Sequence, residues 1–146
     1  VQYTKDRDGF RKFCKQVMDD PHAHEFQTSR LIDADVFRIL KDVPCHADFM
    51  RYVQWHNLAH ISTQHHLGIP TMVLHYEDYD ADLEGTTAKL LDFLEMPKRG
   101  EPIDFVAGKE YAKEYFTKEE RAAVRVAVQR LSLMETWKQL QHYFEE

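Results

Sequence analysis

The sequence is poor in cysteine, in positive charge and in long apolar runs, and each shortage excludes a class of protein. Its two cysteines, Cys14 and Cys45, match neither a paired metal-ligand spacing nor a disulfide-rich scaffold, so we expect reduced thiols, with a single bridge between them as the alternative. Lysine and arginine number 19 against 25 aspartate and glutamate residues, and no window gathers the cations into a stripe with stacking aromatic residues. This balance argues against nucleic acid or an anionic membrane as the main partner.

No stretch of about 18 apolar residues is present, which argues against a membrane-spanning helix in this segment. The first twenty residues contain no signal-peptide core, and the sequence predicts a soluble segment. The chain begins at Val1 rather than at a methionine, so we expect a processed or partial segment of a longer protein. Its length suits a single domain over 1–146 or the C-terminal portion of one.

The sequence also lacks the local patterns that mark catalytic sites. It contains no Gly-rich phosphate loop and no serine or cysteine in a nucleophile turn. His56 and His60 lie four residues apart on a predicted helix and could chelate a zinc ion. They share their face with Phe49, however, and the histidines that follow, His65 and His66, point away from the pair on an α-helical wheel. We therefore favour structural histidines and expect no metal.

Hydrophobic periodicity and capping residues predict a chain that is mostly helical. Residues 22–41 are expected to be partly loop with a short helix near 35–40, and residues 103–116 are expected to be a loop. The last helix starts with the capping box of Thr117 and Glu120 and bends near Ser132. The four predicted helices cover Thr4–Met18, 46–67, 84–95 and 117 to the C-terminus. The first ends before Pro21, and the second ends at Gly68, which we expect to be a left-handed cap.

The segment Thr71–Tyr76, TMVLHY, interrupts this helical pattern. It is too short for a helix, is rich in β-forming residues and lacks strict alternation, which is typical of a strand buried on both faces of a parallel sheet. Together with the helices on either side it predicts an α/β fold. We expect part of a P-loop-like three-layer fold, with a parallel sheet flanked by helices and helix-rich in this segment.

Four acidic residues follow the predicted strand: Glu77, Asp78, Asp80 and Asp82. Carboxylates at the carboxyl end of a parallel strand lie where α/β sheets bind ligands, and paired acids there could do acid–base work or hold Mg²⁺. For Asp80 and Asp82 we favour loop and capping roles, since Asp82 precedes a helix. For Tyr76 and Glu77 a binding role and a structural role both stay open.

The order W…GIPTMVLHYEDY…TTAKLLDFLEMP, followed by YFTKEER…TWKQLQHYF, resembles the C-terminal half of the sulfotransferase domain over about 46–144. The strand-end Tyr-Glu-Asp motif within Val73–Asp78 is the most specific part of the match. The helix near Leu90–Leu94 and the pair Phe116–Thr117 are weaker signals. The resemblance implies part of an enzyme that transfers a sulfuryl group from 3′-phosphoadenosine 5′-phosphosulfate (PAPS) to a hydroxyl or amine acceptor.

In that family the tyrosine of the motif lies against the adenine side of the nucleotide, so the resemblance implies this role for Tyr76. An Arg-Lys-Gly loop of the family grips the 3′-phosphate of the nucleotide. Gly108 and Lys109 stand in about the same place here, without the matching arginine. The phosphosulfate-binding lysine and the base of the family have no match, because they belong upstream of Val1, and no residue is assigned to catalysis.

The implied partners are the nucleotide donor and an acceptor that the sequence does not identify. The family has cytosolic and Golgi members, between which the sequence does not distinguish. The alternative hypothesis is a non-catalytic sulfotransferase-like subunit or interaction module of a larger assembly, in which a protein partner covers exposed apolar surface. A metal-dependent hydrolase built on the histidines and aspartates is a third, weaker hypothesis.

Overall fold

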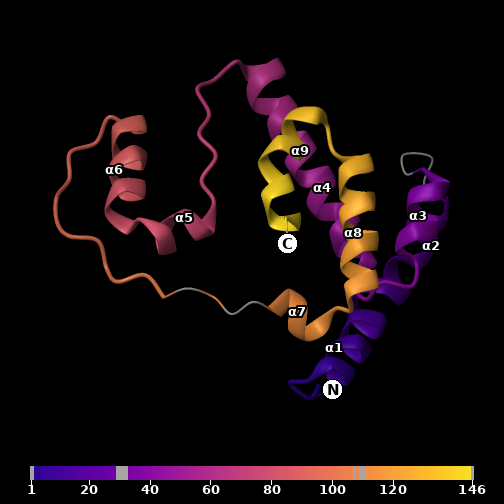
Figure 1. Ribbon diagram of the computed structural model, residues 1–146. Coiled ribbons are helices and arrows are strands. Elements are labelled where there is room, and N and C mark those ends of the chain that lie inside the picture. The colour runs from indigo at the N-terminus through magenta and orange to yellow at the C-terminus, as the bar shows by residue number, and fades with distance from the viewer. Residues whose placement is uncertain (1, 29–32, 107, 109–110, 146) are drawn as a thin grey trace. The chain divides into compact units, whose positions relative to one another are not determined.

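The computed structural model describes residues 2–28, 33–106, 108 and 111–145 (Figure 1). These residues form helices and irregular segments, and no β-strand occurs among them. The expected α/β fold with a parallel sheet was therefore wrong. Two units make up the chain: a larger unit of Val1–Gly68 with Glu110–Glu146, and a smaller unit of Ile69–Lys109.

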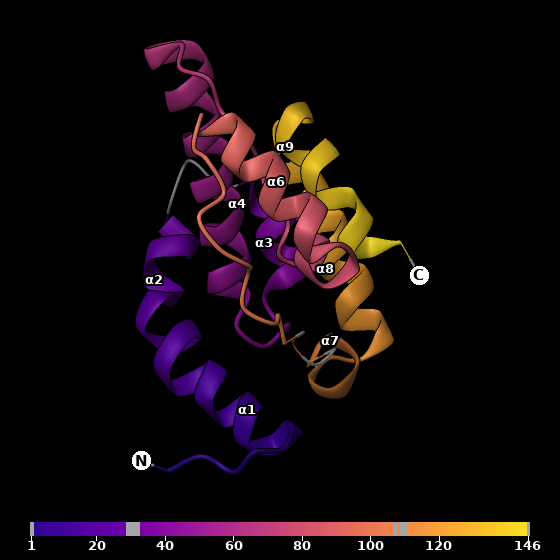
Figure 2. The same cartoon turned by 90° about the vertical axis from the view of Figure 1, so that its left-hand side faces the viewer.

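The first helical stretch is longer than its sequence predicts. Helix α1 (Arg7–Phe13), a π-helical segment (Cys14–Asp19) and helix α2 (Asp20–Thr28) follow one another without a break (Figure 2). Proline usually ends a helix because it lacks an N–H donor and crowds the preceding turn. Here the backbone N–H of Asp20 bonds to the carbonyl of Lys15, five residues back, so the wider π-turn precedes Pro21 and the helix continues through it.

In the larger unit, helices α4, α8 and α9 lie side by side, and α3 packs against α8 (Figure 1). The predicted helix over 46–67 is confirmed: α4 passes into a π-helical segment that ends at Gly68, whose φ of 59° gives the left-handed cap. The short helix expected near 35–40 is also confirmed. The elements are α3 (Ala34–Leu40), α4 (His46–His60), the π-helix Ile61–Leu67, α7 (Tyr111–Tyr115), α8 (Lys118–Leu131), α9 (Met134–Leu140) and the 3-10 helix Gln141–Phe144.

Aliphatic side chains from α3, α4, α8 and α9 form the core of the larger unit. Removing one such side chain from water stabilises a fold by roughly 1.5–3 kcal/mol, so the contacts between these helices outweigh local propensities. All core members are at most 5% exposed. They are Val36, Leu40, Val43, Ala47, Met50, Val53, Val124, Ala127, Val128 and Leu140.

The N-terminus of α8 has the predicted capping box. The backbone N–H of Glu120 donates to the Thr117 hydroxyl at 3.2 Å, and the Glu120 carboxylate accepts the Thr117 N–H at 2.8 Å. The same carboxylate pairs with Arg11 of α1 at 2.9 Å, with the Glu120 side chain only 15% exposed. One acidic side chain thus caps α8 and attaches α1 to it.

The predicted bend near Ser132 is confirmed, and α4 holds it in place. The Asn57 side chain donates to the Leu131 carbonyl at 2.8 Å and accepts the Leu133 N–H at 3.0 Å. These two backbone groups flank the point where α8 ends and α9 begins. Asn57 therefore satisfies both groups that the break leaves without helical partners.

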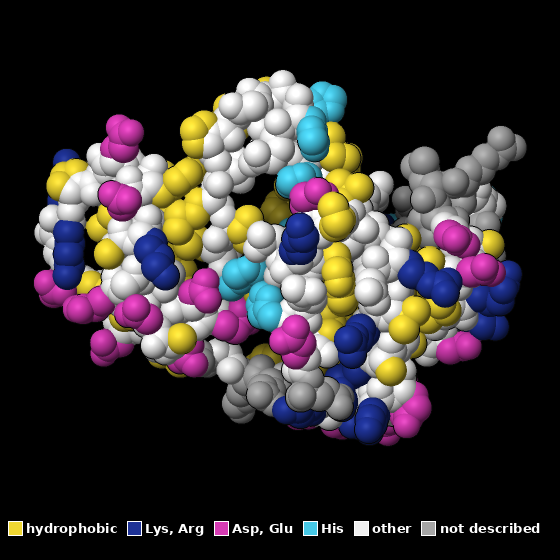
Figure 3. All heavy atoms as spheres, turned by 45° about the horizontal axis from the view of Figure 1, so that its top comes forward, with side chains coloured by type: hydrophobic (Ala, Val, Ile, Leu, Met, Phe, Trp, Pro, Cys, Tyr) yellow, Lys and Arg dark blue, Asp and Glu magenta, His cyan; other side chains and the backbone are white. Residues whose placement is uncertain are grey.

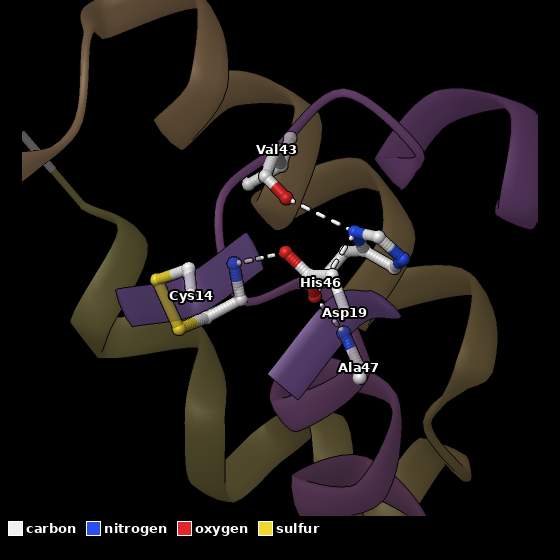
Figure 4. Close-up of a disulfide and its surroundings, with 6 residues drawn as sticks. Cys14, Asp19, Val43, His46 and Ala47 are labelled. Atoms are coloured by element: carbon white, nitrogen blue, oxygen red, sulfur yellow. Dashed lines mark hydrogen bonds and ion pairs between the residues drawn. A yellow bond between two sulfur atoms is a disulfide. The ribbon is translucent and has the colours of Figure 1, made fainter. Parts of the chain in front are cut away.

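Cys14 and Cys45 form a disulfide that links the π-helix after α1 to the start of α4 (Figure 4). The expectation of reduced thiols was wrong, because the fold brings their Cα atoms to 4.6 Å although 31 residues separate them. Both cysteines are buried, at 0% and 7% exposure. The bridge closes the loop that contains α2 and α3.

Beside this bridge, the Asp19 carboxylate caps α4 from outside the helix (Figure 4). It accepts the Cys45 N–H at 2.9 Å and the Ala47 N–H at 3.3 Å. Cys45 itself has φ 57° and provides no side-chain cap. His46 Nδ1 lies 3.2 Å from both the Asp19 carboxylate and the Val43 carbonyl. The positive end of the α4 dipole therefore faces a nearly buried carboxylate.

The smaller unit contains an irregular segment over 69–75, α5 (Tyr76–Ala81) and α6 (Leu83–Phe93). The predicted strand over Thr71–Tyr76 was wrong. A strand needs a neighbouring strand for its backbone hydrogen bonds, and the described residues provide none. Ile69 and Val73 are accordingly about half exposed. The predicted helix over 84–95 is confirmed apart from its last two residues. None of the described helices is long and apolar enough to cross a membrane.

Reduction of the Cys14–Cys45 bridge is expected to lower the free energy of unfolding by about 3–4 kcal/mol, because a closed loop of this length restricts the unfolded chain. The corresponding fall in Tm is roughly 10 °C by differential scanning calorimetry with and without dithiothreitol. A Cys14→Ala/Cys45→Ala double variant is the control and should not respond to the reductant. An unchanged Tm for the reduced wild type would contradict the prediction.

The substitution Asn57→Ala is expected to lower the free energy of unfolding, measured by chemical denaturation, by about 2 kcal/mol. Two partly buried backbone groups at the α8–α9 break would lose their hydrogen-bond partner. Gln54→Ala, at an exposed position of the same helix, is the matched control and should change stability by less than about 0.5 kcal/mol. Equal effects of the two substitutions would show that Asn57 does not hold the break.

Candidate functional site

Tyr76, the residue for which the resemblance implies contact with adenine, is the first residue of α5. Its side chain is 54% exposed. The hydroxyl donates to the Val106 carbonyl at 3.2 Å, and the ring lies 4.6 Å from the Phe105 ring at an angle of 60°. The Tyr79 ring stacks on the Phe105 ring, with the ring centroids 5.8 Å apart. We refer to Tyr76, Tyr79 and Phe105 as the aromatic cluster.

The segment that leads to Gly108, the second candidate binding residue, is joined to the aromatic cluster by the hydrogen bond between Tyr76 and Val106. Gly108 follows Val106 by two residues and is exposed, and a Cβ atom added to it would meet nothing within 4 Å. Lys109, the other candidate for the phosphate, lies outside the described residues. Tyr76 and the segment before Gly108 are therefore neighbours although they are about 30 residues apart in the sequence.

Sequence reasoning missed Phe105 and Tyr79 as members of this set. The signal for Phe105 was available in the segment IDFV, where one aromatic residue stands in a stretch expected to be a loop. A large aromatic residue in a loop needs other apolar groups to shield it from water, so a contact was predictable. Its partner was not, because nothing local specifies which distant ring it meets.

The acidic residues after Tyr76 have mainly structural contacts. The Asp82 carboxylate accepts the Gly85 N–H at 2.9 Å and so caps α6, as predicted. The backbone carbonyl of Asp78 accepts the buried Thr86 hydroxyl at 2.9 Å, which joins α5 to α6. Glu77 stands with Asp78 in the first turn of α5, where negative charge complements the helix dipole. Within the described ranges, no group of three or more histidine, cysteine or acidic residues is placed to hold a metal ion.

One cation of the smaller unit, Lys98, has an acidic partner outside the aromatic cluster. Lys98 pairs with Glu101 at 2.7 Å, and this hydrogen bond raises the pKa of the Lys98 ammonium. A hollow of about 560 Å³ runs along α6 and includes Lys98, but its lining does not include Tyr76 or Gly108. Lys98 is therefore held at this hollow rather than at the aromatic cluster.

Histidine side chains reach the surface of the molecule, and Lys and Arg are mixed there with Asp and Glu (Figure 3). The His56 ring lies 4.3 Å from the Tyr52 ring and 4.9 Å from Trp55. The His60 ring lies 5.7 Å from His65, so the expectation that His65 points away was wrong. In the π-helical segment after His60, residues five apart share a face, whereas an α-helical wheel separates them.

Comparisons with known proteins add no relative to this picture. No protein-family model matches the chain, and no curated protein or solved structure shows significant similarity to it. The resemblance to sulfotransferases accordingly stays a prediction that rests on the sequence motif, and the described residues lack the parallel sheet that this resemblance implies.

The capping role of Asp82 predicts different results for two substitutions. Asp82→Ala should destabilise α6 by about 1 kcal/mol, seen as faster hydrogen exchange of the Gly85 amide, because the first turn loses an acceptor. Asp82→Asn should keep the exchange rate near that of the wild type, since asparagine caps equally well. If the carboxylate instead held Mg²⁺, Asn would be as damaging as Ala, and added Mg²⁺ would slow exchange in the wild type alone.

Proposed function

We propose that this chain contributes to the donor-nucleotide site of a PAPS-dependent sulfotransferase. The observation that carries the proposal is the hydrogen bond between Tyr76 and Val106, which joins the two segments that the family motif implicates in nucleotide binding. One is the Tyr-Glu-Asp motif, and the other is the loop with Gly108 and Lys109.

In this proposal the half-exposed ring of Tyr76 faces the adenine. Phe105, which is itself stacked on Tyr79, keeps that ring in position. Gly108 lets the 3′-phosphate approach the backbone closely, and Lys109 supplies one positive charge. The bound PAPS would supply the sulfuryl group, and the hydroxyl or amine acceptor would receive it. The 146 residues would hold one end of the donor and leave the transfer itself to other groups.

The disulfide favours one of the two compartments in which the family occurs. Buried disulfides form and persist in oxidising environments and are rare in the cytosol, where thiol reductants keep cysteines reduced. The Cys14–Cys45 bridge is buried and closes the part of the larger unit that contains α2 and α3. The proposed activity therefore belongs in the lumen of the secretory pathway rather than in the cytosol.

A second candidate function is a non-catalytic interaction module. Large apolar side chains are exposed in both units, among them Ile103 at 91%, Val106 at 83% and Trp55 at 66%. Such surface commonly marks contact with another protein. In this alternative the aromatic cluster is a structural contact of the smaller unit, and the partner covers the apolar surface.

Calorimetric titration with 3′-phosphoadenosine 5′-phosphate, the desulfated donor, tests the proposed function. Tyr76→Ala is expected to weaken binding at least fivefold, because stacking of a base on an aromatic ring is worth about 1–3 kcal/mol. Tyr111→Ala removes a ring of the same 54% exposure and should leave the affinity unchanged. Gly108→Ala should weaken nucleotide binding without altering stability. Gly100→Ala, whose added Cβ also meets nothing within 4 Å, should leave both binding and stability unchanged.

The two candidate functions give different outcomes in the same preparation. Absence of nucleotide binding, or equal affinities for Tyr76→Ala and Tyr111→Ala, would contradict the donor-site proposal. The interaction module predicts self-association or a stable complex in light scattering after size exclusion. A monodisperse monomer of 17.4 kDa would contradict that alternative.

A further inference from the structure

The larger unit contains a cavity of about 520 Å³ between α4, α7, α8 and the C-terminal 3-10 helix. It belongs to a different unit from the aromatic cluster, and no residue is shared between them. Its volume is in the range of sites that bind small organic molecules. Four of its lining residues belong to the hydrophobic core or pack against it, and we refer to them as the floor: Phe49, Phe116, Val124 and Phe144.

This floor is continuous with the hydrophobic core and is therefore preformed. Val124 is a core residue at 5% exposure, and the three phenylalanines pack against the core. The Phe49 and Phe116 rings lie 5.7 Å apart in an edge arrangement, and Phe144 stacks on Trp137 at 5.8 Å. Aromatic walls held on several sides offer a flat apolar ligand a contact surface at little conformational cost.

The open side of the cavity carries positive charge from a single face of α8. Lys118, Arg121 and Arg125 all line it, and their spacing of three and four residues places them on one side of the helix. Arg121 donates to the Phe116 carbonyl at 3.2 Å, which holds its guanidinium beside the aromatic wall. One acid, Glu145, also lines the cavity. In a chain with a net charge of −6, three cations against one acid are a local excess of the opposite sign.

We propose that this cavity binds a small aromatic anion, with its flat apolar body on the phenylalanine floor and its sulfate, phosphate or carboxylate group at Arg125 and Lys118. Apolar contact alone would accept neutral aromatic compounds equally well. The cationic rim gives the preference for an anion, because guanidinium groups bind oxyanions through paired N–H donors. The site is independent of the donor nucleotide and of the compartment.

Fluorescence titration of the full chain with 2-naphthyl sulfate tests the proposal, with neutral 2-naphthol as the reference ligand. The sulfate is expected to bind at least fivefold more tightly than the naphthol, and this preference should fall as salt is added. Arg125→Ala should weaken sulfate binding at least fivefold and leave naphthol binding unchanged. Arg130→Ala removes an exposed cation from the same helix outside the cavity and should leave both affinities unchanged.

A second variant tests the cavity rather than the charge. Ala122 is exposed and lines the cavity, so Ala122→Trp should fill it and abolish binding of both ligands while the Tm stays within a few degrees of the wild type. The proposal is overturned if the sulfate does not bind, if naphthol binds as tightly, if Arg125→Ala and Arg130→Ala behave alike, or if Ala122→Trp binds normally. Failure of nucleotide binding at Tyr76 would not affect any of these outcomes.

Discussion

The capped and crosslinked start of α4 is the constraint on which the larger unit depends. The Asp19 carboxylate is only 13% exposed and meets two backbone amides of α4 together with the His46 ring. A carboxylate so nearly buried is stable only while those donors stay in place. The position of α4 and the hydrogen bonds of Asp19 therefore depend on each other. The adjacent disulfide fixes the same junction covalently. Once α4 is placed, Met50 and Val53 enter the core, Asn57 reaches the α8–α9 break and Phe49 lines the cavity.

The two candidate ligand sites follow from different parts of this organisation. The cavity beside α8 is built on core helices, so its aromatic floor is fixed by the same packing that stabilises the fold. The aromatic cluster at Tyr76 is instead formed by the start of a short helix and an irregular segment. Binding groups often occupy such connecting segments, where backbone and side chains are open to a ligand. The function proposed for the aromatic cluster is based on the sequence resemblance. The function proposed for the cavity is based on the residues that line it.

The fold class and the site were predictable to different extents. The Tyr-Glu-Asp motif drew attention to Tyr76, and the structure adds Val106, Phe105 and Tyr79 to its surroundings. The strand prediction for the same segment failed, because β-forming residues favour a strand only where another strand accepts their hydrogen bonds. The histidine analysis failed at His65 for a related reason, since an α-helical wheel does not describe a π-turn.

The sequence by itself determined the features that depend on residues within a few positions of one another. The capping box at Thr117, the cap at Asp82 and the left-handed Gly68 are of this kind, because their hydrogen bonds and dihedral angles are local. Tertiary structure alone decided the disulfide, the Asp19 cap and the contact between Tyr76 and Val106. Each joins residues about 30 positions apart, and such pairs meet only after apolar burial has chosen which helices pack together.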